Sequence, residues 1–162
     1  MNHKIKNLPA LKKILNTARA KNKKIVFTNG CFDLLHRGHI DYLRKAGALG
    51  NVLVVGLNSD SSVRKIKGPG RPITPQADRA EILASLEFVD YIIIFNSETP
   101  FEIINKLQPD VLVKGADWKK ESVSGAVLVE SRGGRVRLIK YLKGYSTTKI
   151  FNKILSRGQV DG

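Results

Sequence analysis

Thr28-Asn-Gly-Cys-Phe-Asp-Leu-Leu-His-Arg-Gly-His39 carries the clearest structural signal in this sequence of 162 residues. The stretch begins at the end of an apolar, β-branched run at 24–28 and leads into a segment with helical periodicity at 38–49. A buried strand that passes through a loop into a helix is the first half of a βαβ unit. The stretch therefore predicts a parallel sheet with a functional loop after its first strand.

The same alternation continues along the chain. Further strands are predicted at 51–57, 89–95, 110–114 and 135–141, and further helices at 8–21, 75–86, 100–107, 123–132 and 147–156. Apolar strands flanked by helices predict an α/β fold with a doubly wound, mostly parallel five-stranded sheet. Ligands of such sheets bind beyond the carboxyl ends of the strands, so we expect the site in the loops that lead from strand to helix. The irregular stretch 59–73 is a candidate functional loop.

The length of the chain is typical of one globular domain. We divide it into an N-terminal basic amphipathic helix within residues 1–23, interpreted as an addition to the core, and a main domain at 24–162. The longest apolar runs have the length of strands, which excludes a membrane-spanning protein. The single cysteine, Cys31, indicates a reducing environment, and we expect a cytoplasmic protein.

The chain is strongly basic. It holds 28 Lys and Arg residues against 14 Asp and Glu residues, a net charge of +14 at pH 7. Such a chain attracts nucleic acids, anionic lipids or phosphorylated small molecules. Charge alone does not choose among these partners, but the lysines are dispersed and aromatic residues are only 7% of the sequence, which disfavours a nucleic-acid reader.

Two of the three histidines, His36 and His39, flank Gly38 at the start of the predicted helix 38–49. A helix N-terminus attracts phosphate through its free N–H groups and its dipole, and imidazoles at this position can donate further hydrogen bonds. The glycine lets a ligand approach the backbone. The pattern indicates an anion site.

Other interpretations of these residues stay open at this point. The two histidines could bind zinc with Asp33 or Asp41 as a further ligand, or they could be structural. Cys31 could be a nucleophile paired with His36, although a lone cysteine after a strand is more often a small buried apolar residue.

The segment Gly30-Cys-Phe-Asp-Leu-Leu-His-Arg-Gly-His39 contains an HxGH motif within a longer GxFDxxHxGH pattern, and it resembles the cytidylyltransferase-like nucleotidyltransferases. Three later segments match that superfamily in the same order: Asn58-Ser-Asp60, Lys114-Gly-Ala-Asp117 and Tyr145-Ser-Thr-Thr148. Within the superfamily, Lys65-Ile-Lys-Gly-Pro-Gly-Arg-Pro-Ile73 followed by Asp78-Arg79 is similar to the adenylyltransferase unit of ADP-heptose synthases. The resemblance covers about residues 24–155.

This resemblance implies a Rossmann-like fold and the transfer of AMP from ATP to a sugar 1-phosphate, with release of diphosphate. The sugar phosphate implied is D-glycero-β-D-manno-heptose 1-phosphate, which places the reaction in ADP-heptose and lipopolysaccharide core biosynthesis. Mg²⁺ is implied as a cofactor that accompanies ATP, and a homodimer is compatible with the resemblance.

The resemblance also assigns roles to residues of this chain. It implies catalytic roles for His36, His39 and Lys67, with Lys65 as the alternative lysine. It implies nucleotide binding by Asn29, Gly30, Phe32, Gly38, Asn58, Lys114, Gly115, Asp117, Ser146, Thr147 and Thr148. It implies substrate binding by Asp33, Lys65, Arg71 and Arg79.

Two rival functions remain. A glycerol-3-phosphate-type cytidylyltransferase shares the HxGH motif and the Ser-Thr-Thr helix start, so the choice between ATP and CTP separates it from the adenylyltransferase. A basic nucleic-acid-binding protein is the alternative from another class.

Overall fold

The computed structural model describes residues 2–157, and its centre is one parallel sheet. The strands are β1 (Ile25–Gly30), β2 (Val52–Asn58), β3 (Tyr91–Phe95), β4 (Val111–Gly115) and β5 (Arg135–Ile139). They lie in the order β3-β2-β1-β4-β5, and every neighbouring pair is parallel. The predicted doubly wound sheet is confirmed. Its strand order reverses at the boundary between β1 and β4, where a ligand is expected.

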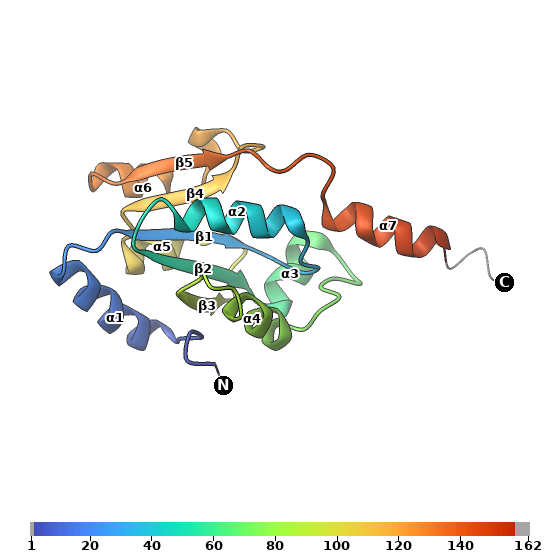
Figure 1. Cartoon of the computed structure of the whole chain (residues 1–162), viewed down its shortest axis with the longest axis horizontal. Coiled ribbons are helices and arrows are strands. Elements are labelled where there is room, and N and C mark those ends of the chain that lie inside the picture. Colours follow the sequence, from blue (N-terminus) through green and yellow to red (C-terminus); the bar gives the residue numbers. More distant parts are fainter. Residues whose placement is uncertain (1, 158–162) are drawn as a thin grey trace.

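Helices cover both faces of the sheet (Figure 1). They are α1 (Leu8–Ala20), α2 (Arg37–Gly47), α3 (Asp60–Lys67), α4 (Gln76–Ala84), α5 (Phe101–Leu107), α6 (Ala126–Ser131) and α7 (Thr147–Arg157), with a short 3₁₀ turn η1 (Lys120–Ser122) before α6. The helix predicted at 123–132 is shorter than expected, and the last strand ends two residues before the predicted boundary.

The alternation of side chains along each strand divides the core into two layers. On β1, Ile25 and Phe27 point into a cluster covered by α1, α5 and α6. The residue between them, Val26, points into a second cluster covered by α2 and α4. Both faces of β1, β2, β3 and β4 are therefore covered, which explains why these strands are mostly apolar, whereas the edge strand β5 contains the exposed Arg135 and Arg137.

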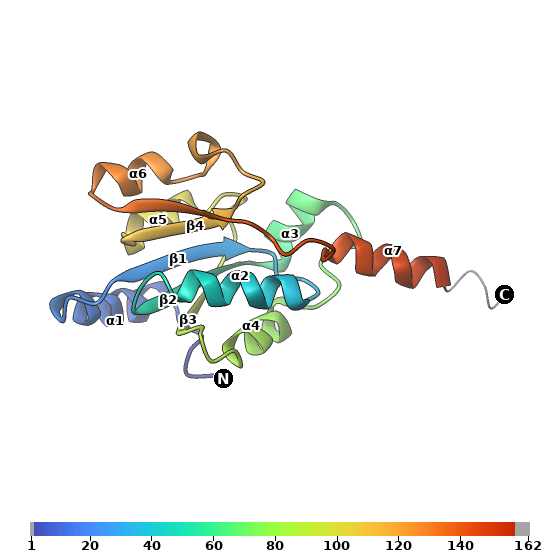
Figure 2. The same ribbon diagram turned by 45° about the horizontal axis from the view of Figure 1, so that its top comes forward.

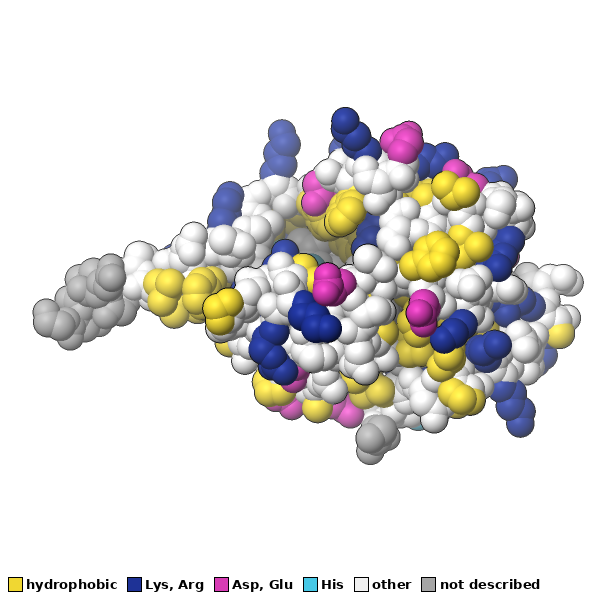
Figure 3. All heavy atoms as spheres, turned by 180° about the vertical axis from the view of Figure 1, so that it is seen from behind, with side chains coloured by type: hydrophobic (Ala, Val, Ile, Leu, Met, Phe, Trp, Pro, Cys, Tyr) yellow, Lys and Arg dark blue, Asp and Glu magenta, His cyan; other side chains and the backbone are white. Residues whose placement is uncertain are grey.

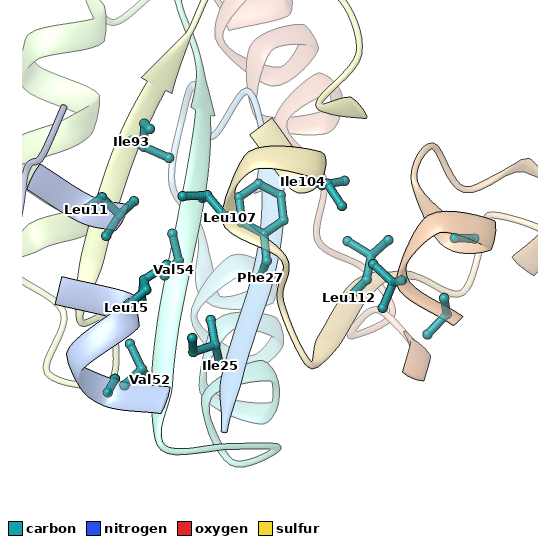
Figure 4. Packing of buried hydrophobic residues seen from close by; sticks show 14 of the residues in the cluster. Leu11, Leu15, Ile25, Phe27, Val52, Val54, Ile93, Ile104, Leu107 and Leu112 are labelled. Atoms are coloured by element: carbon teal, nitrogen blue, oxygen red, sulfur yellow. The ribbon is translucent and has the colours of Figure 1, made fainter. Parts of the chain in front are cut away.

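Helix α1 is part of this core. Leu11 and Leu15 are fully buried, and Figure 4 shows both side chains directed at the strands. The segment before the helix joins the sheet as well, because Ile5 forms a parallel bridge with Ile92 of β3. The sequence suggested an addition to the core, whereas the structure buries the apolar face of α1 inside it.

The stretch 59–73 is less irregular than predicted, because it contains α3. Ser59 caps this helix by accepting a hydrogen bond from the Ser62 amide at 3.2 Å. Of the apolar residues in α3, only Val63 is buried. The helix depends on its cap more than on an apolar stripe, so hydrophobic periodicity does not reveal it.

Helix α7 projects away from the sheet and its covering helices, as two views show (Figures 1 and 2). Its N-terminus lies at the end of the molecule to which the strands point. In residues 2–157, no helix combines the length and the apolar character that a membrane span requires.

Replacement of Leu15 by alanine should lower the free energy of unfolding by about 2–5 kcal/mol, because it leaves a cavity in a fully buried site. Urea denaturation measures the change. The control is Lys12→Ala on the exposed side of the same helix, for which a shift within about 0.5 kcal/mol is expected. Equal effects of the two substitutions would contradict the placement of α1 in the core.

Candidate active site

A cavity of about 850 Å³ opens at the carboxyl end of the sheet, between the loops that follow β1, β2 and β4 and the start of α7. Figure 3 shows a hollow in the surface beside the N-terminal end of α7. The cavity is lined by these sequence-predicted residues: Asn29, Gly30, Phe32, Asp33, His39, Asn58, Lys65, Lys67, Arg71, Lys114, Asp117, Thr147 and Thr148. His36, Gly38, Arg79, Gly115 and Ser146 are not in its lining.

The two predicted histidines form a stacked pair. Their ring centroids are 3.9 Å apart and the rings are tilted by 17°. A Cβ atom at position 38 would come within 3.0 Å of the His36 ring and 3.1 Å of Tyr145 Cβ, so Gly38 makes this stacking possible. The Nδ1 atoms of both histidines are buried and have no hydrogen-bond partner within residues 2–157. Buried polar atoms are normally paired, so two unpaired imidazole nitrogens at one place are unusual, and only His39 lines the cavity.

The start of α2 adds positive character to the same place. His36 is the N-cap residue, its side chain makes no capping hydrogen bond, and the first turn contains no acidic residue. The free N–H groups and the dipole of the helix therefore act together with the imidazole of His39 at the cavity wall. This arrangement can bind a phosphate group.

Burial keeps the two rings neutral. It lowers the pKa of His39 to about 4, with a smaller contribution from the neighbouring His36, and it also lowers the pKa of His36. At neutral pH each ring has one N–H donor and one acceptor nitrogen. The approach of a phosphate would favour the charged form of His39.

The turn between β1 and the histidines has an unusual backbone. Phe32 has a φ of 43°, in the left-handed region that a residue with a bulky side chain rarely adopts. Its ring packs against His39 edge to face, with centroids 5.5 Å apart. The next residue, Asp33, accepts hydrogen bonds from the Ile73 amide at 2.8 Å and the Thr74 amide at 2.9 Å. Asp33 thus ties the turn to the segment before α4.

Arg71 connects this turn to α7. Its Nη1 lies 3.0 Å from Oδ2 of Asp33, and its guanidinium lies 5.3 Å from the centre of the Phe151 ring. Arg71 also lines the cavity, as predicted for a residue that binds a phosphorylated substrate. Asp33 holds the loop and Arg71 in place, a supporting role that the sequence did not reveal.

Both candidate lysines, Lys65 and Lys67, lie at the end of α3 and line the cavity. Burial raises the pKa of the Cys31 thiol, and Lys67 is the group that most opposes this shift. The raised pKa disfavours a thiolate and therefore a nucleophilic role for Cys31. Lys65, Lys67 and Cys31 all line the same cavity.

The end of β4 supplies a lysine and two aromatic rings. Burial lowers the pKa of Lys114 to about 8, and its Nζ lies 5.5 Å from the centre of the Trp118 ring. The Tyr141 ring lies directly over Gly115, where a Cβ atom would overlap it. Trp118 and Tyr141 both line the cavity with exposed fractions of 46% and 47%, which leaves them accessible to a planar ligand.

Sequence reasoning leaves Trp118 out of the site, because an isolated tryptophan is more often part of the core or of a partly buried surface, and it misses Tyr141. Trp118 directly follows the Lys114–Asp117 motif, and that position is the signal that could have found it. Tyr141 lies two residues beyond the end of β5, and only the packing of its ring on Gly115 brings it to the cavity.

The three residues of the Ser146-Thr-Thr148 segment have different roles. Oγ of Ser146 accepts a hydrogen bond from the Lys149 amide at 3.1 Å, so this side chain caps α7. Thr147 and Thr148 line the cavity, and the Thr147 hydroxyl also donates to the Leu34 carbonyl at 3.3 Å.

The structure does not support Arg79 as a direct substrate ligand. Its side chain is fully buried, and its guanidinium nitrogens are bonded to the carboxylate of Asp60 and to backbone carbonyls. The family resemblance implied substrate binding by this arginine, and the burial of its side chain cannot be read from its position in the sequence.

A zinc site on the histidines receives no support. Within the described residues, no group of three or more His, Cys, Asp or Glu side chains is close enough to hold a metal ion. The histidines therefore fit the anion site better than a metal centre.

The buried His39 should make the protein sensitive to acid. Its pKa is about 6.5 in the unfolded chain and about 4 in the folded one, so between these values the unfolded state binds more protons and acidification favours it. We expect the free energy of unfolding to fall from pH 6.5 to 4 by about 1–3 kcal/mol more in the wild type than in His39→Gln. Urea titrations at several pH values measure this difference. Identical pH dependence in the two proteins would contradict the assignment.

Comparisons with known proteins agree with this geometry. Residues 27–153 match the family model described as cytidylyltransferase-like. The chain is 56% identical over 152 residues to the bifunctional protein HldE of Geobacter metallireducens and 52% identical over 152 residues to that of Campylobacter concisus. Each alignment covers 94% of this chain and 31% of the relative, so the chain spans about a third of the length of these curated relatives.

Solved structures show the same fold. The lipopolysaccharide core biosynthesis protein from Thermoplasma volcanium superposes with a TM-score of 0.61 at 29% identity, over 74% of this chain and 99% of that one. A pantoate-beta-alanine ligase from Francisella tularensis superposes with a TM-score of 0.62 over 94% of this chain and 77% of that one. Its 19% identity shows a shared fold alone. Since the family model spans the sheet, the stacked histidines and most of α7, the chain belongs to the cytidylyltransferase-like family.

Proposed function

We propose that the protein is an adenylyltransferase that moves AMP from ATP to a sugar 1-phosphate and releases diphosphate. The observation that carries the proposal is the stacked pair His36 and His39 at the uncapped start of α2, beside a cavity with basic side chains. The identity of 56% with a protein named HldE supports D-glycero-β-D-manno-heptose 1-phosphate as the acceptor, and with it a place in ADP-heptose and lipopolysaccharide core biosynthesis.

The site suits a direct displacement at phosphorus. The sugar phosphate oxygen attacks the α-phosphorus of ATP in line with the departing diphosphate, and the protein contributes positioning and charge. His39 donates a hydrogen bond from the cavity wall to the α-phosphate. His36 supports the ring from behind and limits its rotation. Donors that are fixed before the reaction are each worth about 3–4 kcal/mol at a developing charge.

The other assigned side chains in the cavity bind either ATP or the sugar phosphate. Lys67 reaches from the end of α3 to the phosphates, and Thr147 and Thr148 bind the β- and γ-phosphates at the start of α7. Lys114 and Asp117 bind the nucleoside, with Trp118 as a stacking surface for the base.

Arg71 binds the phosphate of the sugar. Its planar guanidinium can make two parallel hydrogen bonds to phosphate oxygens, and Asp33 already holds it at the cavity. In this assignment Asp33 acts on the substrate through Arg71.

Magnesium fits as a partner of the nucleotide. The cavity contains the carboxylates of Asp33, Glu98 and Asp117, but they do not form a cluster of metal ligands within the described residues. Mg²⁺ often keeps water ligands and binds through phosphate oxygens with one or two carboxylates. We therefore propose that Mg²⁺ enters with ATP, where it would neutralise phosphate charge, and that Asp117, a cavity carboxylate assigned to the nucleotide region, would be its protein ligand.

The surface agrees with small-molecule binding. In Figure 3 the lysines and arginines are scattered over the visible face and do not form a continuous stripe. Nucleic-acid-binding surfaces concentrate their positive charge along a face or groove.

The proposed activity is tested by diphosphate release with a panel of acceptors and nucleoside triphosphates. We expect turnover with ATP and heptose 1-phosphate, and at least tenfold slower turnover with CTP. Preference for CTP and glycerol 3-phosphate would overturn the proposal in favour of the rival cytidylyltransferase.

The role of His39 is tested by the variant His39→Ala in the same assay. This substitution should reduce turnover more than a hundredfold, because it removes a donor at the reacting phosphate. Near-wild-type turnover of a folded His39→Ala protein would refute the role of this residue.

The two lysines of α3 should differ. Lys67→Ala should reduce turnover more than Lys65→Ala, because we assign Lys67, the last residue of α3, to the reacting phosphates. Steady-state kinetics of both variants measure the difference, and each serves as the control of the other. The opposite order would show that Lys65 is the residue that reaches the phosphates.

A further inference from the structure

The buried guanidinium of Arg79 contacts four residues in three chain segments at the carboxyl edge of the sheet: the turn after β1, the junction of β2 and α3, and the segment before α4. Its Nε donates to the Thr74 carbonyl at 2.9 Å, before α4. Its Nη1 donates to the Asn58 carbonyl at 2.9 Å, at the end of β2, and to the Cys31 carbonyl after β1. Its Nη2 pairs with the carboxylate of Asp60 at 2.7 Å, in the first turn of α3.

One of these bonds acts on the strained turn. The Cys31 carbonyl belongs to the peptide directly before Phe32, the residue with a φ of 43°. Asp33 holds the other side of the same turn through the Ile73 and Thr74 amides. Unfavourable backbone conformations persist when the surroundings fix them from several directions, and they gather at functional sites. Here Arg79 and Asp33 fix the turn from both sides.

The held turn determines where His39 lies. The Phe32 ring packs edge to face on the His39 ring, so the direction of the Phe32 side chain depends on the backbone that Arg79 restrains. The same guanidinium forms an ion pair with Asp60, the first residue of α3, and the last turn of this helix contains Lys65 and Lys67. Arg79 thus contacts both the turn that carries the histidine and the helix that carries the lysines.

We propose that Arg79 is a positioning residue that sets the histidine turn and the lysine-bearing helix α3 in the relative arrangement required for adenylyl transfer, without touching the substrate. This inference rests on the proposed function for its kinetic consequence and on the contacts above for its structural one. A lysine cannot replace this arginine, because a single ammonium group has three donors at one point and cannot reach four acceptors around a planar fork.

Two measurements on Arg79→Lys test the inference. The first is an NMR pH titration of the His39 ring, in which we expect the pKa to move from about 4 towards 6.5 as the turn loosens and the ring becomes more hydrated. The second is steady-state kinetics, in which we expect kcat to fall at least 30-fold while the KM for ATP changes less than threefold. Arg132→Lys is the matched control, because this arginine also bonds a backbone carbonyl and a side chain, both on Asn105, but lies outside the cavity. It should match the wild type in both measurements.

The outcomes are distinct. An unchanged His39 titration in folded Arg79→Lys, or a kcat equal to that of the wild type, would overturn the inference. If Arg79→Lys does not fold, the same His39 titration is carried out on Asp60→Asn. This substitution removes the ion pair with Arg79 and keeps the three hydrogen bonds from Arg79 to backbone carbonyls. A smaller shift of the His39 pKa in the same direction supports the inference, and no shift overturns it. If the wild type fails to transfer AMP at all, the proposed function is wrong, while the NMR titration still tests the positioning by Arg79.

Discussion

The left-handed backbone of Phe32 is the constraint around which the site is organised. Holding a phenylalanine at a φ of 43° costs on the order of 1 kcal/mol or more, and the burial of its ring in the core against His39 offsets part of this cost. The remaining compensation comes from residues distant in sequence, namely Arg79 on the Cys31 carbonyl and the Ile73 and Thr74 amides on Asp33. The geometry of the loop therefore depends on the complete fold.

The sheet and most of the cavity could be predicted from the sequence, because their signals are local. Strands buried on both faces appear as uniform apolar runs, and the loop after β1 contains its glycine and histidines within twelve residues. The order of strands and helices then follows from the rule that parallel strands require crossovers. Asn29, His39, Lys114 and Thr147 meet at one end of the sheet because each lies at or beyond the carboxyl end of a strand.

What the sequence could not provide depends on contacts between distant segments. The residues around Arg79 in the sequence are of the kind that surround a surface arginine on an amphipathic helix. Only the positions of Cys31, Asn58 and Asp60 in the fold show that Arg79 is buried and bonded to distant segments. Helix α3 is short and polar, so its existence depends on the Ser59 cap, which hydrophobic periodicity does not detect. Tyr141 reaches the cavity because a glycine on another strand leaves space for its ring.

The two edges of the sheet are protected by different means. On β3, Ile92 is bonded through its N–H and C=O to Lys4 and Lys6, so the leading segment occupies part of the open edge. On β5, Arg135 and Arg137 place exposed charged side chains along the opposite edge. Exposed edges of parallel strands invite pairing with other chains, and a covering segment or a row of charges discourages it. Within residues 2–157, neither border of the folded sheet therefore offers a long uncharged strand edge to which another copy of the chain could add a strand.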